Sequence, residues 1–188
     1  MKKLKLDRPY YKHFLKTAQF PYSKDEQSCI QETVNKLNLH KTLGTKPGML
    51  LGKIQSGKTK TFLAIVGLAF DNDFEIAVVL TKGTKALSKQ TQERIQREFK
   101  PFVESDEVLV FDIMQMPQSL SMWELKKKLI FVVKKQKDNL NRLLELFKEK
   151  HDVLSKKKVL IIDDEADYAS IGYRKQHGEI DANLTAVK

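Results

Sequence analysis

The chain has 188 residues, enough for one domain with a hydrophobic core that needs no disulfide or metal, and its 41% hydrophobic and 31% charged residues exclude wholesale disorder. Its single cysteine, Cys29, excludes an intramolecular disulfide framework, and no apolar run approaches the roughly 20 residues of a membrane-spanning helix. The net charge of +10, in which five of the 34 basic residues are arginine, favours a polyanionic partner through counterion release.

The N-terminal region is expected to be a lead-in to the main lobe. Residues 1–22 are rich in basic and aromatic side chains, and no apolar stretch of the kind found in a signal peptide follows the first lysines. We expect this region to be irregular or helical, and residues 23–188 to form a single lobe. The sequence thus predicts a cytoplasmic protein without a membrane partner.

A capping-box pattern marks the start of the first long helix. Ser23 is followed three residues later by Glu26, and apolar side chains then recur at helical spacing. After a loop at 44–48, short apolar runs alternate with helical segments. We expect strands at 49–51, 75–81, 107–113, 129–133 and 159–162. We expect helices at 59–70, 85–99, 121–128 and 138–150.

The alternation of strands and helices predicts an α/β fold. Continuous apolar runs such as AVVL and VLII are typical of strands that are buried on both faces of a parallel sheet. We therefore expect a parallel sheet with helices on both faces and right-handed crossovers. In such sheets ligands bind at the carboxyl ends of the strands, so the residues that follow each strand are the candidates for chemistry.

The segment after the first expected strand has the spacing of a phosphate-binding loop, G-x-x-x-x-G-K-[ST]. It reads Gly52-Lys53-Ile54-Gln55-Ser56-Gly57-Lys58-Thr59. Glycines let backbone N–H groups close around a phosphate, and the following helix adds its positive N-terminal end. Lys58 is expected to neutralise the β- and γ-phosphates of ATP, and the hydroxyl of Thr59 to ligate Mg²⁺. Gln55, Ser56 and the two glycines complete the expected nucleotide contacts.

The last expected strand leads into an acidic segment that suits phosphoryl transfer. It reads Asp163-Asp164-Glu165-Ala166-Asp167. Asp164 is expected to hold Mg²⁺ through its water shell, and Glu165 to orient and deprotonate the attacking water. Asp163 is the alternative metal residue, and Asp164 is favoured because a glutamate follows it directly.

Gly52–Thr59 and Asp164-Glu165-Ala166-Asp167 resemble motifs I and II of superfamily-two helicases and translocases of the DEAD/DEAH type. Together with LTKGTKALSKQTQERI and IIDDEADYAS, they are similar to helicase-like ATPases of bacterial restriction and defence proteins. The resemblance covers roughly residues 23–172. It implies an amino-terminal RecA-like P-loop NTPase lobe that uses ATP and Mg²⁺ to move on nucleic acid, with DNA favoured over RNA.

The same resemblance implies nucleic-acid and adenine contacts. Thr81, Lys82, Gly83 and Thr84 lie where motif Ia contacts the nucleic-acid backbone, and Lys134 lies where motif Ib is expected. Thr84 has the alternative role of a helix cap. Gln27, near a helix start, has a spacing similar to that of the adenine-reading glutamine, with Gln31 as its competitor.

Helicase-type ATPases work with two RecA-like lobes, the second of which supplies an arginine finger. No segment after Asp167 resembles a second lobe, so we expect the chain to be the first lobe and to need a second lobe or a partner subunit. The isolated chain is expected to hydrolyse ATP slowly or not at all. The alternative function is a nucleotide-dependent regulatory or assembly ATPase that does not unwind nucleic acid.

Overall fold

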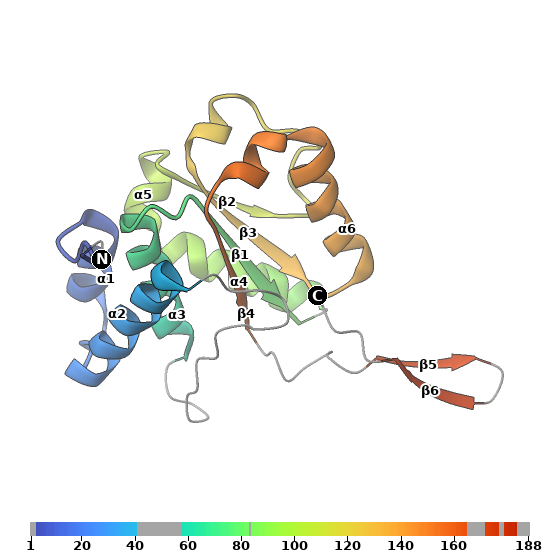
Figure 1. Ribbon diagram of the computed structural model, residues 1–188, viewed down its shortest axis with the longest axis horizontal. Helices are drawn as coiled ribbons and strands as arrows, with labels where there is room; N and C mark the ends of the chain where they lie inside the picture. Colours follow the sequence, from blue (N-terminus) through green and yellow to red (C-terminus); the bar gives the residue numbers. More distant parts are fainter. Residues whose placement is uncertain (1–2, 41–57, 83, 165–171, 177–178, 184–188) are drawn as a thin grey trace.

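The core of the protein is a four-stranded sheet in which all strands are parallel, in the order β2-β3-β1-β4 (Figure 1). The computed structural model describes residues 3–40, 58–82, 84–164, 172–176 and 179–183. The strands of this sheet are β1 (Ile76–Thr81), β2 (Val108–Asp112), β3 (Lys128–Lys134) and β4 (Val159–Asp163). A separate antiparallel pair is formed by β5 (Gly172–Gln176) and β6 (Glu179–Asn183).

Helices cover both faces of the sheet and give it two hydrophobic clusters. The α-helices are α1 (Pro9–Thr17), α2 (Lys24–Leu39), α3 (Lys58–Asp71), α4 (Lys85–Glu98), α5 (Lys100–Glu104) and α6 (Lys137–Glu145). One cluster joins α1 to α5 with alternate side chains of the strands, such as Val79 and Val132. The other joins α6 and short turns to the opposite strand positions, such as Val78 and Phe131. The expected α/β fold with a parallel sheet and helices on both faces is therefore present.

The two helical connections that leave the carboxyl ends of β1 and β3 run to opposite faces of the sheet. After β1 the chain crosses one face through α4, and after β3 it crosses the other face through α6. These crossovers run in opposite directions along the sheet and on opposite faces, so they have the same hand. Because β1 and β3 are neighbours, their carboxyl ends form the topological switch point at which α/β sheets bind ligands.

Four of the five expected strands form within one residue of their expected bounds, and the strand expected at 49–51 lies outside the described residues. The capping box at Ser23 is confirmed, since its hydroxyl accepts from the N–H of Glu26 and the Glu26 carboxylate accepts from the N–H of Ser23. The helix expected at 121–128 is wrong. Only a 3₁₀ turn, Glu124–Lys126, forms there, because Lys128 already begins β3.

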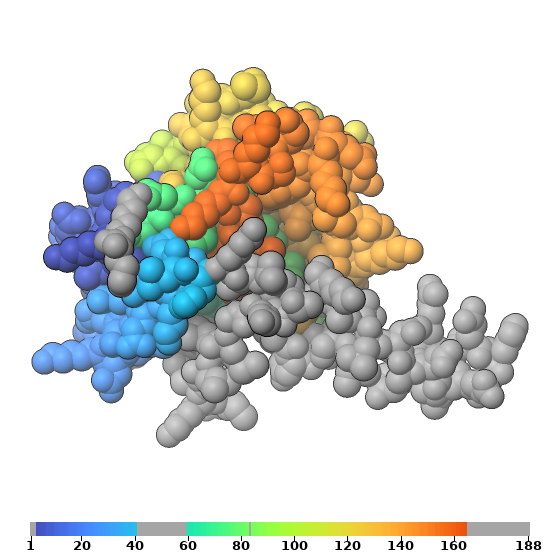
Figure 2. Space-filling model, viewed as in Figure 1, coloured from blue at the N-terminus to red at the C-terminus, as the bar shows by residue number. Residues whose placement is uncertain are grey.

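The helix expected at 138–150 is only partly α-helical. The structure has α6, then a π-helical turn at Leu146–Lys150 and a 3₁₀ helix at Asp152–Lys156. The segment that follows, just before β4, contacts the end of α2, where Lys158 donates a hydrogen bond to Asn38. Figure 2 shows α2 (blue to cyan) beside this segment (orange) on one face of the molecule.

Part of the N-terminal lead-in is helical and packs into the core. The helix α1 buries Tyr11 and Phe14 against α3, and a Cβ on Gly67 of α3 would lie 2.8 Å from the ring of Phe14. The last residue of α3, Asp71, accepts hydrogen bonds from the backbone N–H groups of Tyr10 and Tyr11. A buried carboxylate thus caps the first turn of α1, where N–H groups have no partner within the helix.

Asp71 is expected to make stability depend on pH. Burial raises the pKa of Asp71 to about 6, against the opposing effect of the hydrogen bonds from Tyr11 and Tyr10. A carboxyl whose pKa is raised by folding holds more protons in the folded state, so its contribution to stability falls as pH rises from about 4 to about 6. Relative to Asp71→Asn, the wild type should lose up to about 3 kcal/mol across this window. Urea unfolding at several pH values measures the difference, and a flat difference would exclude this role.

Candidate nucleotide and nucleic-acid site

The start of α3 is where the sequence places the phosphate-binding lysine. Lys58 and Thr59 are the first residues of this helix. At its other end, Asp71 leads through a short turn to the start of β1, so the 14-residue helix runs back along the sheet from its carboxyl edge. Its N-terminus, the end that attracts anions, is therefore directed to the edge at which β4 ends (Figure 1). Gly52, Gln55, Ser56 and Gly57, and the side chains of Lys58 and Thr59, lie outside the described part.

The acidic segment begins where β4 ends at the same edge. Asp164 is half-buried, and its backbone N–H donates to the carbonyl of Leu80 at 3.1 Å, which ties the turn to the neighbouring strand β1. The carboxylate of Asp163, the last residue of β4, forms an ion pair of 2.9 Å with Lys135. Glu165 lies outside the described residues. The ion pair thus engages Asp163, the alternative metal residue, with a lysine.

The residues after β1 have mixed roles. Thr81 is 3% exposed, and its hydroxyl donates to the carbonyl of Lys82 at 3.4 Å. The hydroxyl of Thr84 accepts a hydrogen bond from the N–H of Leu87 and caps α4, which is the alternative role considered for it. Gly83 lies outside the described residues. This segment therefore offers a helix N-terminus and the half-buried Lys82, but not the buried hydroxyl of Thr81, to a ligand at the surface.

Lys134, which the sequence places in the nucleic-acid contact, is 8% exposed. It pairs in register with Thr81 across the junction of β1 and β3. A side chain this deeply buried cannot follow a nucleic-acid backbone at the surface, so we leave Lys134 out of the proposed interface. Lys134 lies at the topological switch point, but it is buried in the protein interior.

Gln27 lies close to the first turn of α3, whereas Gln31 contacts a different helix. The Gln27 amide donates to the carbonyl of Tyr22 at 2.9 Å, and the Tyr22 hydroxyl donates to the carbonyl of Lys60 at 3.0 Å. The ammonium of Lys60 lies 4.0 Å from the centre of the Tyr22 ring. The Gln31 amide instead donates to the Tyr11 hydroxyl of α1 at 3.5 Å. Proximity to the start of α3 favours Gln27 as the adenine-reading candidate.

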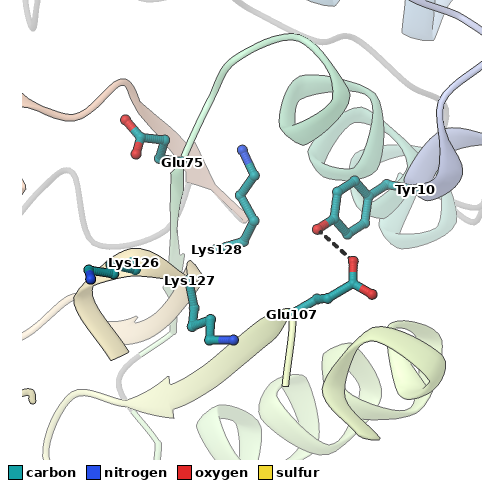
Figure 3. Close-up of a pocket in the computed structure, with 6 residues that line it drawn as sticks. All are labelled: Tyr10, Glu75, Glu107, Lys126, Lys127 and Lys128. Carbon is teal, nitrogen blue, oxygen red and sulfur yellow. Dashed lines mark hydrogen bonds between the residues drawn. The ribbon is translucent and has the colours of Figure 1, made fainter. Parts of the chain in front are cut away.

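A cavity of about 260 Å³ lies at the opposite, amino edge of the sheet (Figure 3). Its charged groups are largely engaged with neighbours: Lys128 donates to the carbonyl of Phe74 at 2.6 Å, and Glu75 pairs with Lys157 at 2.7 Å. Figure 3 shows Tyr10 and Glu107 facing one another, and burial and the nearby Glu107 raise the pKa of Tyr10 to about 12. The cavity is lined by Tyr10, Glu75, Glu107, Lys126, Lys127 and Lys128. We infer that these contacts hold α1 and the loops at the amino edge of the sheet in place.

Metal and membrane features add little to this picture. Within the described ranges, no group of three or more histidine, cysteine, aspartate or glutamate side chains could hold a metal ion. A Mg²⁺ ion that binds with a nucleotide needs only one or two protein carboxylates, because phosphates and waters supply its other ligands.

In the part of the chain that the structure describes, no helix has the length and apolar character to cross a membrane.

The geometry defines the class of protein as an α/β protein whose candidate site lies at the carboxyl edge of a parallel sheet. No protein-family model, curated protein or solved structure matches the chain.

The sequence did not indicate the ion pair between Lys135 and Asp163. A signal was present, because each residue lies within two positions of the end of an apolar run that forms a strand. Pairing them requires the strand order, in which β3 and β4 lie on either side of β1. That order cannot be derived from the apolar runs alone.

Proposed function

We propose that the chain is a RecA-like ATP-binding lobe of a nucleic-acid-dependent ATPase, a helicase or translocase in bacterial restriction or phage defence. One observation carries the proposal: α3, which begins at Lys58 and Thr59, starts at the same edge of the sheet at which β4 ends at Asp163, directly before Asp164. These two segments are about a hundred residues apart in the sequence. Their common edge is what the phosphate-loop and DEAD motifs require if both serve one nucleotide.

The residues fit Mg²⁺ and ATP by the chemistry of their donors. Carboxylate and hydroxyl oxygens are the hard ligands that Mg²⁺ prefers, and Asp164 and Thr59 provide them. Mg²⁺, when bound with ATP, neutralises negative charge on the phosphates. Lys58 binds the phosphates with its ammonium group, Gln27 orients the adenine, and Glu165 takes a proton from the attacking water.

The nucleic-acid part of the proposal has its support in charge and in the loop after β1. The net charge of +10 favours a polyanion, and the N-terminus of α4 with Lys82 lies at the topological switch point. Phosphate contacts of this kind position a nucleic acid without reading its sequence. A second RecA-like lobe or partner subunit completes the proposed site by adding an arginine from the other side of the ATP.

Nucleotide binding and hydrolysis test the proposal together. A fluorescent ADP analogue should bind the chain in the presence of Mg²⁺, and ATP hydrolysis by the isolated chain should be slow or undetectable, because an arginine finger contributes roughly 10³–10⁵ in rate. Addition of single- and double-stranded DNA and RNA to the chain supplemented with a second lobe or partner subunit then separates two functions. Stimulation by nucleic acid supports the motor, whereas nucleotide binding with no effect of any nucleic acid supports the regulatory ATPase. Absence of nucleotide binding would overturn both.

A further inference from the structure

Lys135 is a buried cation at the carboxyl edge of the sheet. Its side chain is 5% exposed, and its ammonium lies 2.9 Å from a carboxylate oxygen of Asp163, whose own side chain is 35% exposed. Lys135 directly follows β3, and Asp163 is the last residue of β4. Because β1 lies between these two strands, the Lys135 side chain passes the end of β1 to reach Asp163.

Backbone hydrogen bonds fix both ends of this ion pair to β1. The N–H of Lys135 donates to the carbonyl of Thr81 at 2.9 Å, and the N–H of Asp164 donates to the carbonyl of Leu80 at 3.1 Å. The last two carbonyls of β1 therefore hold the chain after β3 and the chain after β4. The ion pair adds a side-chain link between the same two turns. Together, the two backbone hydrogen bonds and the ion pair restrain Asp163, the residue that precedes Asp164.

Stability alone does not account for a buried lysine at this position. The Lys135 ammonium loses hydration on folding, and a well-packed apolar side chain of similar volume is often as stabilising or more so. An ion pair does, however, restrict the geometry of the carboxylate that it binds. Here that carboxylate, Asp163, immediately precedes the proposed metal residue, so the restriction acts on the backbone that carries Asp164.

We propose that Lys135 is a positioning residue that fixes the acidic turn, so that Asp164 is oriented toward the metal-nucleotide before any ligand arrives. The role rests on the proposed function, because it concerns the orientation of the proposed Mg²⁺ residue. Lys135 thus serves the nucleotide site through Asp163, whereas the resemblance places the neighbouring Lys134 in a nucleic-acid contact. Groups that orient metal ligands from behind typically contribute 10–100-fold to metal affinity.

The test compares Lys135→Met, which keeps the length of the side chain and removes its charge, with Lys126→Met as the matched control. Lys126 is exposed at the opposite edge of the sheet, so both variants lose one positive charge. Binding of a fluorescent ADP analogue is measured in EDTA and across a Mg²⁺ titration. Lys135→Met should raise the Mg²⁺ concentration needed for half-maximal strengthening of binding by about 10–100-fold, with binding in EDTA nearly unchanged. Lys126→Met should match the wild type in both conditions.

Two further measurements separate positioning from a general structural effect. Hydrogen exchange of the Asp164 amide in the ligand-free protein should be at least about tenfold faster in Lys135→Met, because the turn loses its side-chain restraint. Asp163→Asn should reproduce the higher Mg²⁺ requirement of Lys135→Met, and the double variant should need no more Mg²⁺ than either single variant.

Each outcome has a distinct meaning. If the wild type shows no Mg²⁺-dependent nucleotide binding, the proposed function is overturned, and the role of Lys135 with it. If the wild type binds but Lys135→Met has the Mg²⁺ requirement and the Asp164 amide protection of the wild type, only the positioning role is overturned. If binding in EDTA falls as far as binding in Mg²⁺, the effect is general, and the positioning role is again overturned.

Discussion

Replacing Lys58 by alanine is expected to abolish nucleotide binding. The change removes an ammonium group from the first position of α3, where it would face the β- and γ-phosphates, and leaves their charge less compensated. Loss of one partner from a buried charge pair typically costs about 2–5 kcal/mol, which corresponds to an affinity loss of about 30-fold to several thousand-fold. Titration of a fluorescent ADP analogue in Mg²⁺ measures this loss directly.

Lys85→Ala is the matched control for this prediction. Lys85 is also the first residue of an α-helix, α4, and it is exposed, so the control removes the same group from an equivalent helical position. Its nucleotide affinity should equal that of the wild type. Equal affinity in Lys58→Ala and the wild type would contradict the assignment of the phosphate-binding loop, provided that both variants unfold at the same urea concentration.

Glu165→Gln is expected to keep nucleotide binding and to remove hydrolysis. The amide has the shape of the carboxylate but cannot take a proton from the attacking water. A general base contributes about 10²–10⁴ to the rate, so turnover should fall by a factor in this range. The measurement is single-turnover hydrolysis of labelled ATP, made with the protein supplemented by nucleic acid and by a second lobe or partner subunit where one is identified.

The control for this variant is Glu104→Gln, an exposed glutamate that ends α5 and pairs with Lys100 on the surface. Its hydrolysis should match that of the wild type. Wild-type turnover in Glu165→Gln would show that another group activates the water, and the assignment of the DEAD segment would then have to change. Loss of nucleotide binding in Glu165→Gln would instead indicate that this residue supports the site structurally.

Local sequence patterns predicted most of the secondary structure because they report local physics. Apolar runs such as AVVL form strands where both faces are covered, and Ser23 with Glu26 satisfies N–H groups at a helix start whatever the surroundings. The expected helix at 121–128 does not form. There β3 takes Lys128 into the sheet, so tertiary pairing overrides local preference.

The sequence by itself determined the α/β class, four of the strands and, to within one residue, the start of α3, because each depends on neighbours along the chain. Only the tertiary structure decided the strand order β2-β3-β1-β4, the burial of Lys134 and the pairing of Lys135 with Asp163. It also decided that Asp71 caps α1 from a distance of some sixty residues. The reason is physical: an ion pair or a cap forms between groups that are close in space, and closeness across a sheet is set by which strands pair, a choice that depends on the whole core at once.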